Sequence, residues 1–219
     1  MILEKIWHKH NLIIVLLILF YAVGTGLFMI EETRHLFKFL TPFSLILSFG
    51  AVLVMHKKWS GRLALAFVIV FTASLFIEII GVRTGVLFGE YVYGSALGIK
   101  IMDTPVMIGL NWLGLVYCTS ALVNHYPLNK ISSIFLGAGL MVVYDLVLEY
   151  VAPVMDMWSW QTRYPGIRNF GMWLLAAMVF HALFRLLDLK IENKAARFLF
   201  LIQILFFCGI ALHALLTTE

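Results

Sequence analysis

Long apolar runs separated by short polar stretches dominate the chain. Because a helix needs roughly 20 apolar residues to cross the hydrocarbon layer of a membrane, each run is long enough to be a transmembrane helix. The pattern predicts about seven such helices, at residues 11–30, 36–55, 62–82, 104–123, 131–152, 169–188 and 196–216. We therefore expect an all-α, polytopic membrane helical bundle that forms a single domain over residues 1–219.

The composition supports this class. Hydrophobic residues make up 62% of the chain and charged residues only 13%, whereas about a quarter of the residues in a soluble domain are charged. The net charge of +4 comes from Lys and Arg residues at the ends of the apolar runs, which is typical of a membrane topology signal. We expect no nucleic acid as a partner.

The distribution of Lys and Arg also predicts an orientation. These residues are more numerous on the side of the bundle that holds the N-terminus, where Lys5 and Lys9 precede the first run. The side richer in Lys and Arg faces the cytoplasm in most multi-pass proteins. We therefore expect a cytoplasmic N-terminus, an external C-terminus and a multi-pass location in the cytoplasmic (inner) membrane.

Three acidic residues lie inside the apolar runs. Glu78 is near the end of the third run, and Asp145 and Glu149 are near the end of the fifth. Both runs point outward in the predicted topology, and residues four apart share a helix face, so we expect the three acids at one depth. Acidic side chains within a membrane are costly, and they occur mainly where they pair, line a cavity or take part in chemistry.

Such a cluster is suited to proton transfer. Burial in an apolar phase favours the neutral form of a carboxyl group, whereas hydrogen bonds to its oxygens favour the ionised form. One acid of the cluster would then donate a proton while another accepts one, as general acid–base catalysis requires. The alternative is a structural role, in which the acids reach the membrane interface or link helices.

The loops that follow the two acid-bearing runs, 82–103 and 152–168, are unusually aromatic for exposed segments. They form either a belt at the membrane interface or a lid that folds back over an apolar cavity. Their aromatic residues include Phe88, Tyr91, Tyr93, Trp158 and Trp160. Four further residues begin the return runs at the depth of the acids: Asn111, Trp112, Asn169 and Trp173. The two Asn residues would bind substrate or join helices.

The sequence shows no motif for a metal or a cofactor. Its histidines and its two cysteines, Cys118 and Cys208, have no recognisable ligand spacing,. A phosphate-binding loop, a nucleophile elbow and a dinucleotide-binding fingerprint are also missing. We therefore predict chemistry without a metal or a cofactor.

From about residue 76 to 175, the pattern of fixed residue types resembles a known family. It reads Glu78-x-x-Gly81-x-x-Thr84-Gly85-x-x-Phe88-Gly89-Glu90-Tyr91-x-Tyr93, then Asn111-Trp112, Asp145-x-x-x-Glu149, Trp158-x-Trp160, Asn169 and Trp173. This pattern is similar to the membrane carotenoid 1,2-hydratase family, which includes carotenoid biosynthesis proteins of the bisanhydrobacterioruberin hydratase and gamma-carotene 1'-hydratase type. Tyr150 stands where Pro is usual in that family, and the spacing from Pro165 to Asn169 is one residue longer.

The resemblance implies a cofactor-independent hydratase that adds water across the terminal C1–C2 double bond of an acyclic carotenoid end group. Asp145 would donate the proton and Glu78 would position the water, the reverse assignment being almost as compatible with the sequence, and Glu149 would complete the catalytic acids. The resemblance also implies a set of substrate-binding residues: Thr84, Phe88, Glu90, Tyr91, Tyr93, Asn111, Trp112, Trp158, Trp160, Asn169 and Trp173.

The expected partners are a membrane-dissolved carotenoid, water, the lipid bilayer and other enzymes of the carotenoid pathway. Two alternatives remain open for the function. A lycopene cyclase-type isomerase would begin with the same protonation and then close a ring. A non-catalytic carotenoid- or lipid-binding membrane protein would hold the polyene without changing it.

Overall fold

The computed structural model describes the backbone of residues 2–162 and 164–217, and the side chains of residues 9–37, 39–162 and 164–217. Lys5, which contributed to the predicted orientation, lies outside the described side chains.

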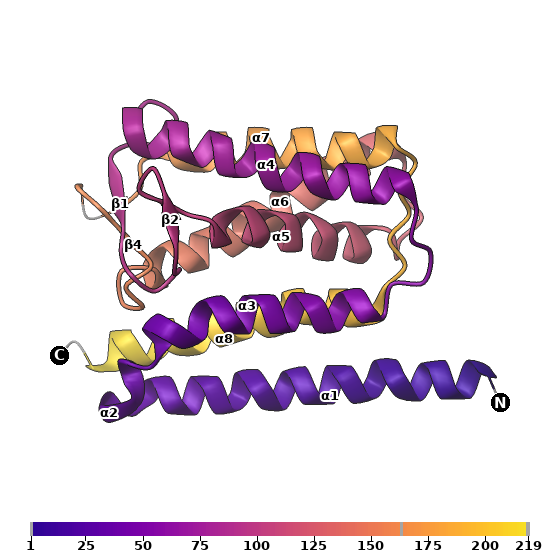
Figure 1. Ribbon diagram of the computed structural model, residues 1–219, viewed down its shortest axis with the longest axis horizontal. Coiled ribbons are helices and arrows are strands. Elements are labelled where there is room, and N and C mark those ends of the chain that lie inside the picture. Colours follow the sequence, from indigo (N-terminus) through magenta and orange to yellow (C-terminus); the bar gives the residue numbers. More distant parts are fainter. Residues whose placement is uncertain (1, 163, 218–219) are drawn as a thin grey trace.

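Helices that run back and forth along one direction make up most of the described chain (Figure 1). They are α1 (Ile2–Met29), α2 (Glu31–Arg34), α3 (Phe37–Val54), α4 (Gly61–Thr84), α5 (Met107–Val123), α6 (Lys130–Val151), α7 (Ile167–Leu186) and α8 (Lys194–Thr217). Each predicted apolar run coincides with one of the longer helices, so the helical class is confirmed.

Five of the described helices are long and apolar enough to cross a membrane: α1, α4, α6, α7 and α8. The second and fourth predicted runs correspond to α3 and α5, whose apolar helical stretches, Phe39–Val54 and Met107–Val123, are shorter. The chain is a multi-pass membrane protein. Seven spans and a cytoplasmic N-terminus remain predictions.

The fourth apolar run becomes helical later than the sequence pattern predicts. Its first residues, Thr104–Pro105 (β3), pair antiparallel with Lys100–Ile101 (β2). The intervening Met102 and Asp103 have positive φ angles of 48° and 66°, which a tight turn requires. The helix α5 therefore begins at Met107 and not at residue 104.

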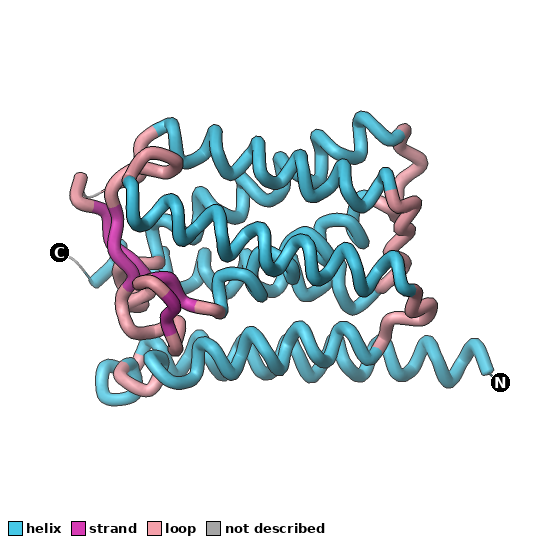
Figure 2. The backbone as a smooth tube through the Cα atoms, turned by 45° about the horizontal axis from the view of Figure 1, so that its top comes forward, coloured by secondary structure: helices cyan, strands magenta, loops and turns pink. Residues whose placement is uncertain are grey.

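The two aromatic loops meet in another small sheet at the end of the bundle away from the N-terminus (Figure 2). Tyr91–Tyr93 (β1) pairs antiparallel with Trp158–Trp160 (β4). Side chains alternate between the two faces of a strand, and here the aromatic side chains are buried while Val92 and Ser159 are exposed. We call residues 91–93 and 158–160 the aromatic cap. The prediction of an all-α chain did not include these short strands.

Local signals explain how α4 and α6 are placed below the cap. The hydroxyl of Ser60 accepts the backbone N–H of Leu63 at the start of α4, at 3.2 Å. The side chain of Asn129 accepts the N–H of Ser132 at the start of α6, at 2.8 Å. These N-cap residues satisfy backbone N–H groups in the first turn that have no partner within the helix. At the other end of α4, Gly85 adopts a left-handed φ of 63°, which stops the helix and turns the chain toward the cap.

The bundle has two sides that bear on the site. The helix α1 packs along α8, with α3 beside them, while α4 to α7 form the opposite side (Figure 1). Large apolar side chains also cover the outer surface, among them Phe39 and Leu205, which are 78% and 70% exposed. An apolar exterior of this kind suits contact with lipid acyl chains.

Candidate active site beneath the aromatic cap

The three intramembrane acids lie in the part of the bundle that the aromatic cap covers. Glu78, Asp145 and Glu149 are 3%, 0% and 7% exposed, respectively. The structure therefore brings together the acids that the topology argument placed at one depth. The aromatic loops fold back over them, as the lid alternative predicted, and donate hydrogen bonds to Glu78 and Glu149.

Glu78 on α4 accepts three hydrogen bonds from aromatic side chains. The hydroxyl of Tyr91 donates to its Oε2 at 2.6 Å, and the hydroxyl of Tyr93 donates to the same oxygen at 2.9 Å. The indole N–H of Trp112 on α5 donates to Oε1 at 3.0 Å. Glu78 thus ties the cap to two helices.

Glu149 on α6 is held in a similar way by the second strand of the cap. The indole N–H groups of Trp158 and Trp160 donate to its Oε2 at 3.0 and 2.5 Å. The side-chain amide of Asn169 on α7 donates to Oε1 at 3.2 Å. The donors to Glu149, like those to Glu78, include two aromatic residues of one strand.

Asp145 has a different environment from its two neighbours. The same amide nitrogen of Asn169 donates to its Oδ2 at 3.1 Å. Its Oδ1 is buried and has no hydrogen-bond partner among the described residues. A buried polar atom without a partner is rare and costly, so this oxygen is the one best placed to meet a substrate or a water molecule.

The register of the cap explains how two strands serve two acids. Tyr91 lies opposite Trp160 and Tyr93 opposite Trp158, with ring centroids 4.9 and 6.0 Å apart. Burial, reinforced by the adjacent Glu78, raises the pKa of both tyrosines well above the ordinary value of a phenol. Both hydroxyls therefore remain protonated and act as hydrogen-bond donors near neutral pH.

Two further aromatic residues predicted for the site also belong to it. Trp112 and Trp173 stack with ring centroids 4.1 Å apart, which fixes the indole that binds Glu78. Phe88 is buried against Gly81 of α4, where a Cβ would lie 2.5 Å from its ring. The sequence pattern contained Gly81, but its role in admitting Phe88 became visible only in the structure.

Three predicted substrate-binding residues lie elsewhere. Thr84 and Glu90 are exposed, and the hydroxyl of Thr84 bonds the backbone where α4 ends, at 2.6 Å from the oxygen of Ile80. Asn111 is half-buried and lines a neighbouring cavity. The structure thus separates Thr84 and Glu90 from the acids, because their side chains are exposed at a helix end and in a loop, whereas Asn111 faces the cavity.

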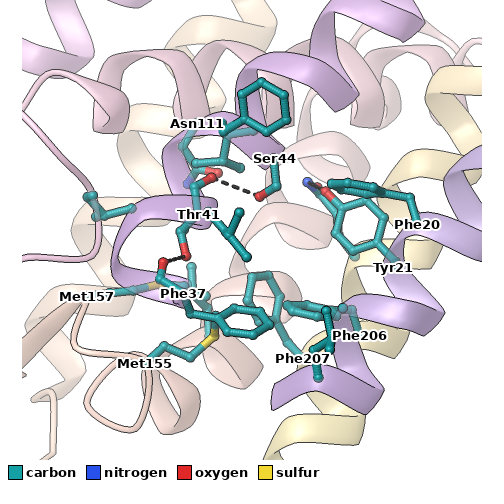
Figure 3. Close-up of a pocket in the computed structure, with 18 of the residues that line it drawn as sticks. Phe20, Tyr21, Phe37, Thr41, Ser44, Asn111, Met155, Met157, Phe206 and Phe207 are labelled. Carbon is teal, nitrogen blue, oxygen red and sulfur yellow. Dashed lines mark hydrogen bonds between the residues drawn. The ribbon is translucent and has the colours of Figure 1, made fainter. Parts of the chain in front are cut away.

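This cavity has a volume of about 410 Å³ and lies between α1, α3, α5, α6 and α8 (Figure 3). Figure 3 shows Tyr21 and Phe206 on one side of it and Met157 on the other. The residues from α1, α3 and α8 were not predicted for the site. Two polar positions inside apolar runs, Tyr21 and Gln203, are the sequence signals that could have indicated them.

The cavity adjoins the acid cluster through consecutive residues of α5 and α6. Neighbours on a helix point about 100° apart, so one turn can face the cavity and the acids at once. In each of three pairs the first residue lines the cavity and the second belongs to the acid cluster: Asn111 and Trp112, Tyr144 and Asp145, Leu148 and Glu149. Trp158 does both, since it lines the cavity and donates to Glu149.

Comparison with known proteins assigns the family. The sequence model of carotenoid biosynthesis proteins matches residues 40–218, which include the acids and the aromatic cap. The chain belongs to the carotenoid biosynthesis protein family. This assignment agrees with the resemblance in the sequence.

One curated relative is bisanhydrobacterioruberin hydratase from Haloarcula japonica. It is 32% identical over 132 residues, an alignment that covers 56% of this chain and 45% of the relative. The match therefore spans less than half the length of that hydratase. No solved structure matches the chain.

Within the described residues, no group of three or more His, Cys, Asp or Glu side chains is arranged to hold a metal ion. Phenol, indole and amide groups donate hydrogen bonds to the three acids, and one oxygen of Asp145 has no partner among the described residues. The site therefore holds two carboxyl groups that each accept three side-chain hydrogen bonds and one that accepts a single bond, all beside an apolar cavity.

Proposed function

We propose that this protein is a carotenoid hydratase of the cytoplasmic membrane, which adds water to the terminal C1–C2 double bond of an acyclic carotenoid end group without a cofactor. The observation that carries the proposal is a buried cluster of three carboxyl groups, one with an unpartnered oxygen, beside an apolar cavity. The relative named as a hydratase supports the same class of reaction.

Asp145 is the proton donor in this proposal. It is fully buried and accepts a single side-chain hydrogen bond. A carboxyl group in such surroundings is accommodated best as the neutral acid, because burial of an unpaired charge is expensive. Its free oxygen then carries the proton that is transferred to C2 of the substrate.

Glu149 is the proposed proton acceptor. It accepts three hydrogen bonds from N–H groups, which favour a carboxylate. It also shares the amide of Asn169 with Asp145, so that an acid and a base lie side by side. From the sequence, Glu78 was expected to position the water. Here its three bonds hold the cap and Trp112, and its carboxylate helps to order the water.

The reaction balances without another reactant. The π electrons of the C1–C2 bond take the proton of Asp145 and form a C2–H bond, which leaves a tertiary cation at C1. A water oxygen bonds to C1, and Glu149 removes one of its protons to give a tertiary alcohol. Return of that proton from Glu149 to Asp145, whose carboxyl groups share Asn169, restores the site.

The aromatic residues have a defined part in this reaction. Indole and phenol faces stabilise a nearby cation by roughly 0.5–2 kcal/mol each. Their N–H and O–H groups point to the carboxyl oxygens, which fixes the rings around the acids. The cap also excludes bulk water, and exclusion of bulk water strengthens the electrostatic interactions inside the site.

Expression in cells that make lycopene tests the proposal. The protein is expected to yield a pigment heavier by one water, whereas Asp145→Asn, at the same expression level, is expected to lower the yield by at least about a hundredfold, as expected for a general acid. Asp188→Asn is the matched control, because Asp188 is an exposed aspartate that pairs only with Lys130 among the described residues.

Other outcomes would reject the proposal. Pigment of changed structure but unchanged mass would indicate a cyclase-type isomerase. Bound but unaltered lycopene would indicate a non-catalytic binding protein. Full hydration by both Asp145→Asn and Glu149→Gln would remove the acid–base mechanism.

A further inference from the structure

Several side chains that line the cavity are also exposed on the outer surface of the bundle. Leu16, Leu19 and Val23 of α1 are 54%, 56% and 60% exposed, and Leu40 and Phe43 of α3 are 40% and 58% exposed. Side chains with both properties lie at the mouth of a cavity. The mouth is therefore between α1 and α3, on an apolar surface that faces lipid in a membrane.

The opposite side of α1 is closed against α8. The ring of Tyr21 packs edge-on against Phe206, with centroids 5.3 Å apart. Gly24 faces the same ring, since a Cβ at this position would lie 3.5 Å from Phe206. Thr25 lies close to Gly209 of α8, since a Cβ at Gly209 would be 3.3 Å from the methyl group of Thr25. This packing leaves the side toward α3 as the opening.

The interior suits a hydrocarbon. Two of its polar residues bond within the wall: Gln203 donates to the hydroxyl of Tyr21 at 2.9 Å, and that hydroxyl donates to Ser48 at 3.1 Å. The hydroxyl of Thr41 donates to the backbone oxygen of Phe37 at 2.8 Å (Figure 3). A ligand thus meets apolar atoms and aromatic rings along most of the wall.

The inner end of the cavity reaches the catalytic region. Leu148 and Trp158 line the cavity, and Trp158 is bonded to Glu149. A chain that enters from the lipid between α1 and α3 would therefore end next to the acids. Because the cavity extends from the lipid-facing mouth to the acids, the ligand that suits it is a linear, apolar molecule with a reactive end.

We propose that the cavity binds the polyene chain of the substrate behind its reacting end, and that the polyene enters sideways from the lipid between α1 and α3. The identity of this occupant rests on the proposed function. The family match begins at residue 40, so α1 lies outside it.

A pair of glycines on α1 provides a matched test. Gly24 lines the cavity, whereas a Cβ at Gly26, which is exposed, would meet nothing within 4 Å. Protein purified from lycopene-producing cells is washed in detergent, and the lycopene retained per protein is measured by absorbance. Gly24→Leu is expected to lower lycopene retention about tenfold, because the larger side chain fills part of the cavity and clashes with the polyene. Gly26→Leu is expected to match the parent.

A second pair on α3 guards against misfolding of the first variant. Ser44 lines the cavity, and Gly50 is exposed with open space around its would-be Cβ. Ser44→Leu is expected to lose lycopene like the α1 variant, while Gly50→Leu retains it. Thermal unfolding in detergent identifies any variant that fails to fold, and the other pair then decides.

The outcomes separate this proposal from the proposed function. Equal retention by all folded variants would overturn the cavity as the polyene site, whether or not water is added. Selective loss of lycopene in the cavity variants, with no hydration by the parent, would support the cavity and reject the hydratase. Equal loss of lycopene in cavity variants and controls would also overturn the proposal, because retention would then not depend on the cavity wall.

Discussion

Replacing Asn169 by Leu tests the connection between the two acids of α6. The amide of Asn169 is the described group that donates to both Asp145 and Glu149, at 3.1 and 3.2 Å. Leu has the same number of side-chain heavy atoms as Asn and branches at the same carbon, so the change removes the two hydrogen bonds and keeps a similar side-chain shape. Asp145 then has no hydrogen-bond donor among the described side chains.

The expected loss follows from the two bonds. A hydrogen bond to a charged group contributes about 1.5–3 kcal/mol and one to a neutral group about 1 kcal/mol. With one acid ionised and the other neutral, Asn169→Leu should lower the free energy of unfolding by about 2–4 kcal/mol. Hydration should slow at least about tenfold, because a loss of 1.4 kcal/mol in the transition state is one factor of ten.

Asn111→Leu is the matched control for stability. Asn111 also begins an apolar run, but its side chain makes no hydrogen bond to the described residues and lines the cavity. Its unfolding free energy should change by less than about 0.5 kcal/mol, as for a site without a lost bond. Unfolding is followed by tryptophan fluorescence in mixed micelles with increasing SDS, and hydration is followed in lycopene-containing lipid vesicles.

The reasoning would be refuted by either of two results. The first is that Asn169→Leu equals the parent in both stability and rate, because the loss of the shared hydrogen bonds must lower at least one of them. Equal destabilisation by Asn111→Leu would show that the cost comes from replacing Asn within a membrane helix and not from the acid pair.

Two substitutions test the cap itself. Tyr91→Phe removes one hydrogen bond to Glu78 and should cost about 1.5–3 kcal/mol of unfolding free energy, whereas Tyr126→Phe, at an exposed tyrosine, should cost less than about 0.5 kcal/mol; equal costs in SDS titrations would contradict the assignment. Gly94→Ala places a Cβ 2.2 Å from a backbone oxygen of the turn before β4 and should cost about 1–3 kcal/mol. Gly139→Ala, with no atom within 4 Å of its Cβ, should stabilise α6 by roughly 0.5–1 kcal/mol, and a neutral Gly94→Ala would show that the cap is not held against this turn.

The helices and the common depth of the acids could be predicted from the sequence, because both follow from local information. Apolar run length sets the helices, and alternation of direction places the ends of α4 and α6 together. The pair Asp145 and Glu149 follows from helical spacing alone. The proximity of Glu78 required only that helices running in the same direction end at the same side of the bundle.

The pairing of the cap could not be predicted in the same way. The register of Tyr91 with Trp160 joins segments far apart in the chain, and no local rule fixes which loops meet. Thr84 and Glu90 belong to the same sequence pattern, but the structure places both side chains on the surface, and their role in substrate binding stays a prediction. Adjacency in sequence did not distinguish a side chain that faces the acids from one that faces outward.

The cavity was hidden for a different reason. Its wall is made mostly of apolar residues that any membrane helix contains, and only packing between α1, α3 and α8 leaves space among them. Tyr21 and Gln203 are among its few polar residues. Their hydrogen bond across helices could not be inferred without knowing that α1 packs along α8.

Oxygen labelling tests the central claim most directly. Purified protein in lycopene-containing lipid vesicles is suspended in water enriched in ¹⁸O, and the product is analysed by mass spectrometry. We expect a product heavier by one labelled water, formed by the parent and by Asp188→Asn but not by Asp145→Asn. A hydroxyl group that carries ordinary oxygen, or a product of unchanged mass, would contradict hydration at the acid cluster.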